Sequence, residues 1–166
     1  SNATTALGVD RFSDELPGTA YDLIFEPESG QKPTPLGEKL PDLFPGTVGL
    51  IRADLDLLGL GEERDTALRN ALAPHLPHYD FVIYDSPPSL GILTLNILIA
   101  SRWILIPIQC EYLALEGLSM LLDTLEEIKE SHNPALDILG CLITMSDLRT
   151  NLSQQVVADV HNHLGD

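Results

Sequence analysis

The chain has 166 residues and a mass of 18.1 kDa, with 44% hydrophobic and only 5% aromatic residues. This length is enough for one domain with an aliphatic core. Nine basic and 25 acidic residues give a formal net charge of −16, so most of the surface should repel nucleic acid. Cys110 and Cys141 fit neither a metal motif nor a disulfide framework, which favours a reducing cytosol.

The first 46 residues carry weak secondary-structure signals. We interpret residues 1–3 as the remnant of a cleaved tag, and residues 21–25 are expected to form a short helix or turn. Residues 33–46 contain four prolines and two glycines. The segment 28–46 is therefore predicted to be a loop.

A strand and a helix are predicted next. Residues 47–52 are expected to form the strand, and residues 54–73 the helix, interrupted near its two glycines. Leu68 and Leu72 supply an apolar pair at i, i+4 spacing, and the two prolines that follow end the helix.

The stretch from Asp80 to Asp85 is the most informative part of the sequence. Four apolar or aromatic residues run directly into the Asp85 carboxylate, as in a strand that is buried on both faces. Ligands of open α/β sheets bind at the carboxyl ends of strands, and a magnesium ion that keeps its waters needs few protein ligands. Asp85 is therefore a candidate magnesium ligand. The alternative is an ordinary aspartate of a strand–helix turn, in a cap of the next helix from Ser86 or Ser89.

Strands and helices alternate in the second half of the chain. Hydrophobic residues recur at spacings of three and four between residues 115 and 131, which predicts an amphipathic helix. Asn151 and Gln154 resemble a capping box at the start of a last helix. This alternation predicts a parallel sheet with right-handed crossovers. The remaining expected elements are a helix at 90–101 and strands at 81–85, 103–108 and 137–144.

Three blocks of sequence, at 86–96, 106–119 and 142–156, closely resemble the ParA/Soj family of partition ATPases, which are relatives of MinD. The first reads Ser-Pro-Pro-Ser-Leu-Gly-Ile-Leu-Thr-Leu-Asn, and the resemblance extends from about residue 79 to residue 166. It implies an α/β fold with a three-layer, P-loop NTPase-like (Rossmann-like) parallel sheet flanked by helices. It also implies an ATP hydrolase that acts with ATP and magnesium in chromosome or plasmid partitioning.

The glycine-rich phosphate loop of such ATPases, with its two lysines, does not occur among the 166 residues. The first lysine is Lys32, which a proline follows. Because backbone N–H groups of that loop hold the phosphates, we expect the chain to be an internal fragment. It would form a single α/β domain over residues 1–166 with N-terminal strands missing, bind no cofactor and hydrolyse no ATP.

A missing strand should leave one side of residues 81–84 uncovered. An uncovered apolar strand is a template for pairing with another chain. We therefore predict a homodimer that is distinct from the nucleotide-dependent dimer of the intact ATPase. The alternative is a monomer in which residues 47–52 cover the gap.

The resemblance also assigns a nucleotide site. It implies that Asp85 is catalytic and holds magnesium through water. Pro87 and Pro88 would form the segment that senses the γ-phosphate, with a rigid turn as the plainer interpretation. Met145 and Asp147 would lie near the adenine.

Two further contacts follow from the resemblance. Gln109 and Glu111 would lie at the contact of the ATP-dependent dimer, although an ordinary loop entering a helix fits them equally well. Arg149 matches a position that similar proteins use for nonspecific DNA binding. A single arginine is weak evidence, because phosphate contacts need several cations acting together.

The resemblance leaves a main function and two alternatives. In the first, ATP closes a homodimer, the dimer binds DNA without sequence preference, and a ParB-like partner triggers hydrolysis. That protein would be cytoplasmic and associated with the nucleoid. The second is a non-enzymatic interaction module of the same fold. A MinD-like positioning ATPase is the third, and the amphipathic C-terminal helix that membrane binding would need is not seen in the sequence.

Overall fold

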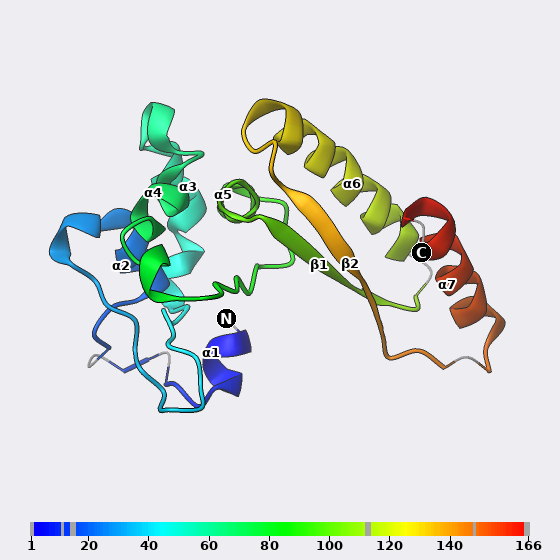
Figure 1. Ribbon diagram of the computed structural model, residues 1–166, viewed down its shortest axis with the longest axis horizontal. Helices are drawn as coiled ribbons and strands as arrows, with labels where there is room; N and C mark the ends of the chain where they lie inside the picture. Colours follow the sequence, from blue (N-terminus) through cyan, green and yellow to red (C-terminus); the bar gives the residue numbers. More distant parts are fainter. Residues whose placement is uncertain (1, 11, 14–15, 112–113, 148, 165–166) are drawn as a thin grey trace. The chain divides into compact units, whose positions relative to one another are not determined.

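The computed structural model describes residues 2–10, 12–13, 16–111, 114–147 and 149–164 (Figure 1). Its contacts divide the chain into two units, Ser1–Ala100 and Ser101–Asp166. The single domain expected over residues 1–166 stays a prediction.

The described part of the first unit is built from short helices around one apolar core. Buried side chains of α2, α3 and α4 form this core, and one face of α5 packs against it. The core residues are Leu23, Ile24, Leu57, Leu68, Ala71 and Leu72. The α-helices are α1 (Asn2–Ala6), α2 (Ala20–Phe25), α3 (Ala53–Leu58), α4 (Ala67–Leu72) and α5 (Ile92–Ala100). The 3-10 helices are Pro27–Ser29, Val48–Ile51, Gly61–Glu63 and Leu76–His78.

The prediction of a strand at residues 47–52 is wrong. Val48–Ile51 form a 3-10 helix, in which Leu50 N donates to Thr47 O at 3.2 Å and Arg52 N to Gly49 O at 3.1 Å. These bonds satisfy the backbone locally, so no neighbouring strand is needed.

The strand predicted at residues 81–85 is also absent from the described structure. The segment Phe81–Tyr84 has no regular secondary structure and pairs with no described strand. Phe81 and Ile83 are 87% and 91% exposed, whereas Tyr84 packs against the core of the first unit. The apolar composition is that of a strand, but a strand also needs a neighbouring backbone to pair with.

A buried asparagine joins α4 to α5. The Asn96 side chain has no exposed surface, and its Oδ1 accepts a hydrogen bond from Leu68 N at 3.2 Å. Its Nδ2 donates to Arg64 O at 2.7 Å and to Ile92 O at 3.1 Å. Leu68 N lies in the first turn of α4, where no intrahelical partner exists. The asparagine therefore fixes the start of α4, and the expected interruption of the helix at 54–73 is confirmed by the Gly61–Glu63 turn.

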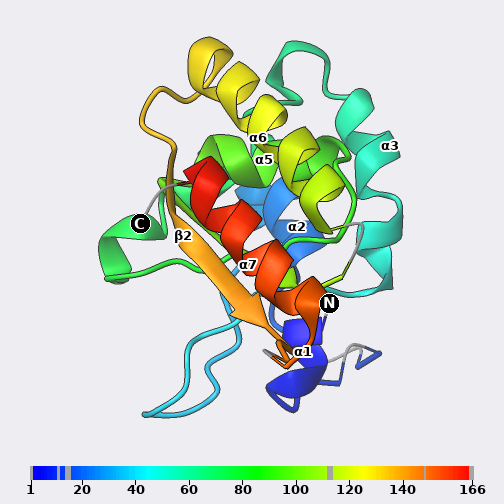
Figure 2. The same cartoon turned by 90° about the vertical axis from the view of Figure 1, so that its right-hand side faces the viewer.

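The second unit contains a two-stranded parallel sheet. Strands β1 (Trp103–Gln109) and β2 (Asp137–Thr144) pair in parallel, and α6 (Ala114–Ser131) connects them before α7 (Asn151–Leu164) follows. Figures 1 and 2 show α6 and α7 on the same face of this sheet. These elements confirm the prediction for this half of the chain, and the chain is an α/β protein with a parallel sheet flanked by helices.

One face of the sheet is buried and the other is not. Ile106 and Ile108 of β1 pack with Leu118 of α6 and with Val156 and Val160 of α7. The register shifts between Ile104, which pairs with Ile138, and Leu105, which pairs with Gly140, so β2 contains a bulge. The apolar side chains on the other face stay at least half exposed: Trp103, Leu105, Leu139 and Leu142. Parallel sheets are normally covered on both faces, whereas the described residues of the second unit by themselves cover one.

The Asn96 contacts yield a stability prediction. We expect Asn96→Ala to lower the free energy of unfolding by about 2–3 kcal/mol, because it leaves the buried Leu68 N–H and Arg64 C=O without their partner. Asn70→Ala is the matched control, since the exposed Asn70 side chain only donates to Thr66 Oγ1 at 3.3 Å. Urea unfolding measures both variants, and equal losses would contradict this role of Asn96.

Candidate functional site

Asp85 lies beside the N-terminal helix of its own unit. Its Oδ2 accepts a hydrogen bond from Ala3 N at 2.9 Å, in the first turn of α1. This helix has five residues, too few to be stable alone. Thr4 is fully buried, and its Oγ1 accepts a hydrogen bond from Gly46 N at 2.9 Å. The Thr4 contact therefore holds α1 in the position where its backbone meets Asp85.

The Asp85 carboxylate fits a magnesium ion that is held mainly by other ligands. No cluster of three or more His, Cys, Asp or Glu side chains that could hold a metal ion occurs among the described residues. Asp85 is exposed, with one oxygen bonded to Ala3 N. Magnesium keeps several waters and binds through one or two carboxylates plus substrate phosphates. A single carboxylate acting through water suits a magnesium ion that is bound mainly by water and phosphates. The described residues do not suit a site in which the protein supplies all ligands.

The turn after Asp85 is fixed by the start of α5. Asp54 Oδ1 accepts a hydrogen bond from Leu93 N at 2.8 Å, and Thr94 Oγ1 donates to Ser89 O at 2.6 Å. A Cβ added at Gly91 would lie 2.7 Å from Asp54 Oδ2, so a larger residue there would displace the Asp54 carboxylate. Asp54 therefore caps the first turn of α5, and the two interpretations of Asp85 stay predictions.

Pro87 and Pro88 lie in this turn, the first half-buried and the second exposed. Proline fixes φ near −65°, so the turn between Asp85 and α5 is stiff at its centre. Both prolines and Asp85 belong to one short segment, as the sequence predicts, but their roles toward a nucleotide stay predictions. Asp54 was missed because it lies 39 residues from Leu93, and nothing in the local sequence marks it as a cap.

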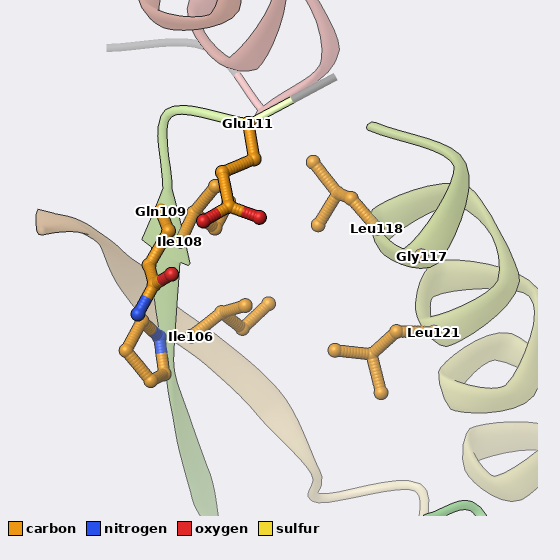
Figure 3. A pocket seen from close by; sticks show the side chains of 8 residues that line it. Ile106, Ile108, Gln109, Glu111, Gly117, Leu118 and Leu121 are labelled. Carbon is orange, nitrogen blue, oxygen red and sulfur yellow. The ribbon is translucent and has the colours of Figure 1, made fainter. Parts of the chain in front are cut away.

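Gln109 and Glu111 lie at the carboxyl end of β1, where a tight turn begins. Glu111 N donates to Gln109 O at 2.8 Å. A hollow of about 330 Å³ separates this end of β1 from the start of α6. Figure 3 shows Ile106 and Ile108 facing Leu118 and Leu121 across it. Its lining is Ile106, Pro107, Ile108, Gln109, Glu111, Gly117, Leu118 and Leu121. The dimer contact predicted for Gln109 and Glu111 stays a prediction.

Met145, Asp147 and Arg149 follow β2 at the same edge of the sheet. Met145 is exposed and has φ +53°, a left-handed conformation that is uncommon for a residue other than glycine. The chain therefore leaves β2 through an abrupt change of direction. Asp85 belongs to the first unit and these residues to the second, so the structure describes two separate groups of candidate site residues.

Asp147 and Arg149 form a two-pronged ion pair. Arg149 Nε donates to Asp147 Oδ1 at 2.8 Å, and Arg149 Nη2 donates to Oδ2 at 2.6 Å. Arg149 N also donates to Asp147 Oδ1 at 3.1 Å. These hydrogen bonds hold the pKa of the Asp147 carboxyl below its usual range and raise the pKa of the Arg149 guanidinium. The Arg149 side chain is 90% exposed, so the pair lies on the surface.

Thr150 caps the last helix, and the capping box predicted from Asn151 and Gln154 is wrong. Thr150 Oγ1 accepts a hydrogen bond from Ser153 N at 3.2 Å, and Thr150 O accepts one from Gln154 N at 3.2 Å. Threonine is a favoured N-cap residue. Thr150 directly before the helical pattern was therefore the sequence signal that could have identified this cap. This cap places Arg149 directly before the first turn of α7.

Comparison with known proteins identifies the family. The family model described as "AAA domain" matches residues 1–138. The chain is 41% identical over 165 residues to the chromosome partitioning protein ParA of Myxococcus xanthus, which covers 98% of this chain and 56% of that protein. It is 40% identical over 168 residues to the sporulation initiation inhibitor protein Soj of Bacillus subtilis, covering 99% and 64%.

A solved structure shares the fold. The cobyrinic acid a,c-diamide synthase of Mycobacterium smegmatis, with bound ADP and magnesium, is 38% identical with a TM-score of 0.80, over 96% of this chain and 64% of that chain. The chain therefore belongs to the AAA domain family, and over nearly its whole length it is similar to the ParA and Soj proteins. It spans less than two thirds of the length of these relatives. No helix in the described residues is long and apolar enough to cross a membrane.

Proposed function

We propose that the chain is part of a ParA/Soj-like ATPase for chromosome or plasmid partitioning, in which Asp85 holds magnesium through water. The observation that carries this proposal is the exposed Asp85 carboxylate, placed beside α1 and before the stiff turn of Pro87 and Pro88. The bound ADP and magnesium of the Mycobacterium smegmatis structure support a magnesium nucleotide as the ligand.

The residues of this chain would orient and hold rather than react. Magnesium bound with ATP neutralises charge that develops on the transferred phosphoryl group. Asp85 would hold the metal by accepting hydrogen bonds from its bound water. Pro87 and Pro88 limit movement of the segment that meets the γ-phosphate. Met145 and Asp147 approach the adenine in the full-length protein, which supplies the phosphate loop.

The wider activity follows the same proposal. ATP closes a homodimer in which Gln109 and Glu111 lie at the contact, and Arg149 then contributes to DNA binding without sequence preference. A ParB-like partner stimulates hydrolysis and releases the DNA. The protein acts in the cytoplasm, at the nucleoid. The relatives named ParA and Soj support this assignment by their similarity over nearly the whole chain.

A non-enzymatic interaction module is the second candidate. The exposure of Phe81 and Ile83 favours it, because an uncovered apolar segment is a surface on which another chain can pack. In this function the 166-residue chain would associate without nucleotide.

The role of Asp85 can be tested by ATP turnover. In the full-length ATPase, we expect Asp85→Ala to lower magnesium-dependent turnover about a hundredfold, because charge stabilisation at a phosphoryl group is lost. Asp80→Ala, at the other end of the same segment, should have little effect. We expect no turnover by the 166-residue chain alone. Undiminished turnover in Asp85→Ala with an unchanged circular dichroism spectrum would contradict the assignment.

The role of Arg149 can be tested with unrelated DNA duplexes. We expect Arg149→Ala to weaken ATP-dependent binding by the full-length protein by a similar factor on every sequence, since phosphate contacts carry no sequence information. The slope of log affinity against log salt should fall by about 1. Arg64→Ala is the control, because Arg64 also pairs with an aspartate, Asp65, at 3.2 Å. A loss on one sequence alone would point to base contacts instead.

Light scattering of the 166-residue chain without nucleotide tests self-association. We expect a dimer mass that decreases to the monomer in Ile83→Lys, because a charge on the uncovered segment opposes pairing. Leu55→Lys is the control, since Leu55 is 72% exposed on α3 and lies outside the segment. A monomer mass for the unmodified chain at high concentration would rule out the nucleotide-independent dimer.

A further inference from the structure

The Asp147–Arg149 pair places the Asp147 carboxylate directly against the guanidinium that is proposed to bind DNA. Two of the five N–H donors of the guanidinium point to the Asp147 oxygens, at 2.8 and 2.6 Å. Paired hydrogen bonds of this kind are among the stronger contacts of arginine. The same carboxylate also accepts the Arg149 backbone N–H at 3.1 Å, so the pair is anchored at the backbone and does not depend on side chains alone.

The turn before α7 holds Asp147 and Arg149 close to each other. Arg149 precedes α7, whose first turn Thr150 caps, and the turn from Asp147 to Thr150 is closed by a hydrogen bond from Thr150 N to Asp147 O at 2.9 Å. The turn therefore keeps the carboxylate within reach of the guanidinium. Because the Arg149 side chain is 90% exposed, a phosphate could reach its remaining donors.

Charge compensation has a measurable effect on phosphate binding. The affinity of a protein for DNA depends on salt through the number of phosphates that its cations neutralise. An arginine that already shares its charge with a carboxylate neutralises a phosphate less effectively. The chain has a formal charge of −16 and few cations. Pairing one of these cations with a carboxylate therefore weakens the attraction of the protein for DNA.

We propose that Asp147 restrains DNA binding by Arg149, as a built-in negative regulator whose carboxylate competes with DNA phosphates for the same guanidinium. This inference rests on the proposed DNA contact of Arg149. Its consequence is that any event that draws the Asp147 carboxylate away strengthens DNA binding without a change in the arginine itself.

The test is a double-mutant cycle in the full-length ATPase at saturating ATP, with a random-sequence duplex as the probe. Asp147→Asn removes the charge and keeps the size of the side chain. We expect it to raise DNA affinity about three- to tenfold at low salt and to steepen the salt slope by up to about 0.9. Glu126→Gln is the matched control, since it makes the same charge change on the exposed face of α6.

The cycle separates the two ideas. In the Asp147→Asn background, Arg149→Ala should cost more affinity than in the unmodified protein, and the double variant should bind like Arg149→Ala. If Arg149→Ala weakens binding but Asp147→Asn leaves it equal or weaker, the regulatory inference is overturned while the DNA contact stands. If Arg149→Ala has no effect in either background, the proposed DNA contact itself is wrong. An equal gain in Glu126→Gln would assign the effect to net charge and overturn the inference.

Discussion

The first unit depends on polar contacts at α5 that its apolar core cannot replace. Asp54 holds the first turn of α5 through Leu93 N, and Asn96 joins the middle of α5 to the start of α4. The helices α1 to α4 have no more than six residues each, too few to persist alone. The unpaired backbone groups at helix ends need hydrogen-bond partners. Asn96 of α5 accepts from Leu68 N of α4, and Asp54 of α3 accepts from Leu93 N of α5. These two contacts fix α5, and the turn between Asp85 and α5 is positioned by its connection to this helix.

In the second unit, the parallel pairing of β1 and β2 determines where the candidate site residues lie. The carboxyl ends of β1 and β2 lie on the same side because the strands are parallel. Gln109 ends β1 and Glu111 follows it, whereas Met145, Asp147 and Arg149 follow β2. Ligands of open α/β sheets bind at this edge, so the proposed dimer, adenine and DNA contacts all come from residues that the sheet topology brings to one side.

The sequence was informative where structure depends on local periodicity. Leu118, Leu125 and Ile128 are buried on α6 as their spacing predicted. The largely apolar strands β1 and β2 pair with each other. It failed where structure depends on a distant partner. Phe81–Tyr84 have the composition of a strand but no described strand beside them, and residues 48–51 satisfied their backbone within a tight turn. For the candidate site, the sequence located Asp85 and the edge residues, but not Asp54, Thr4 or the pairing of Asp147 with Arg149.

The bulge in β2 has a consequence for how this strand can vary. Side chains alternate between the faces of a strand, so one extra residue reverses the pattern beyond it. Ile138 lies on the buried face before the bulge, and Cys141 and Ile143 lie there after it. Deletion of the extra residue, Leu139, would leave Cys141 and Ile143 paired with the same β1 residues and on the buried face, whereas deletion of a residue beyond the bulge would reverse the faces of all residues that follow it. A one-residue deletion is therefore compatible with the buried face of β2 at the bulge, but not between Gly140 and the end of the strand.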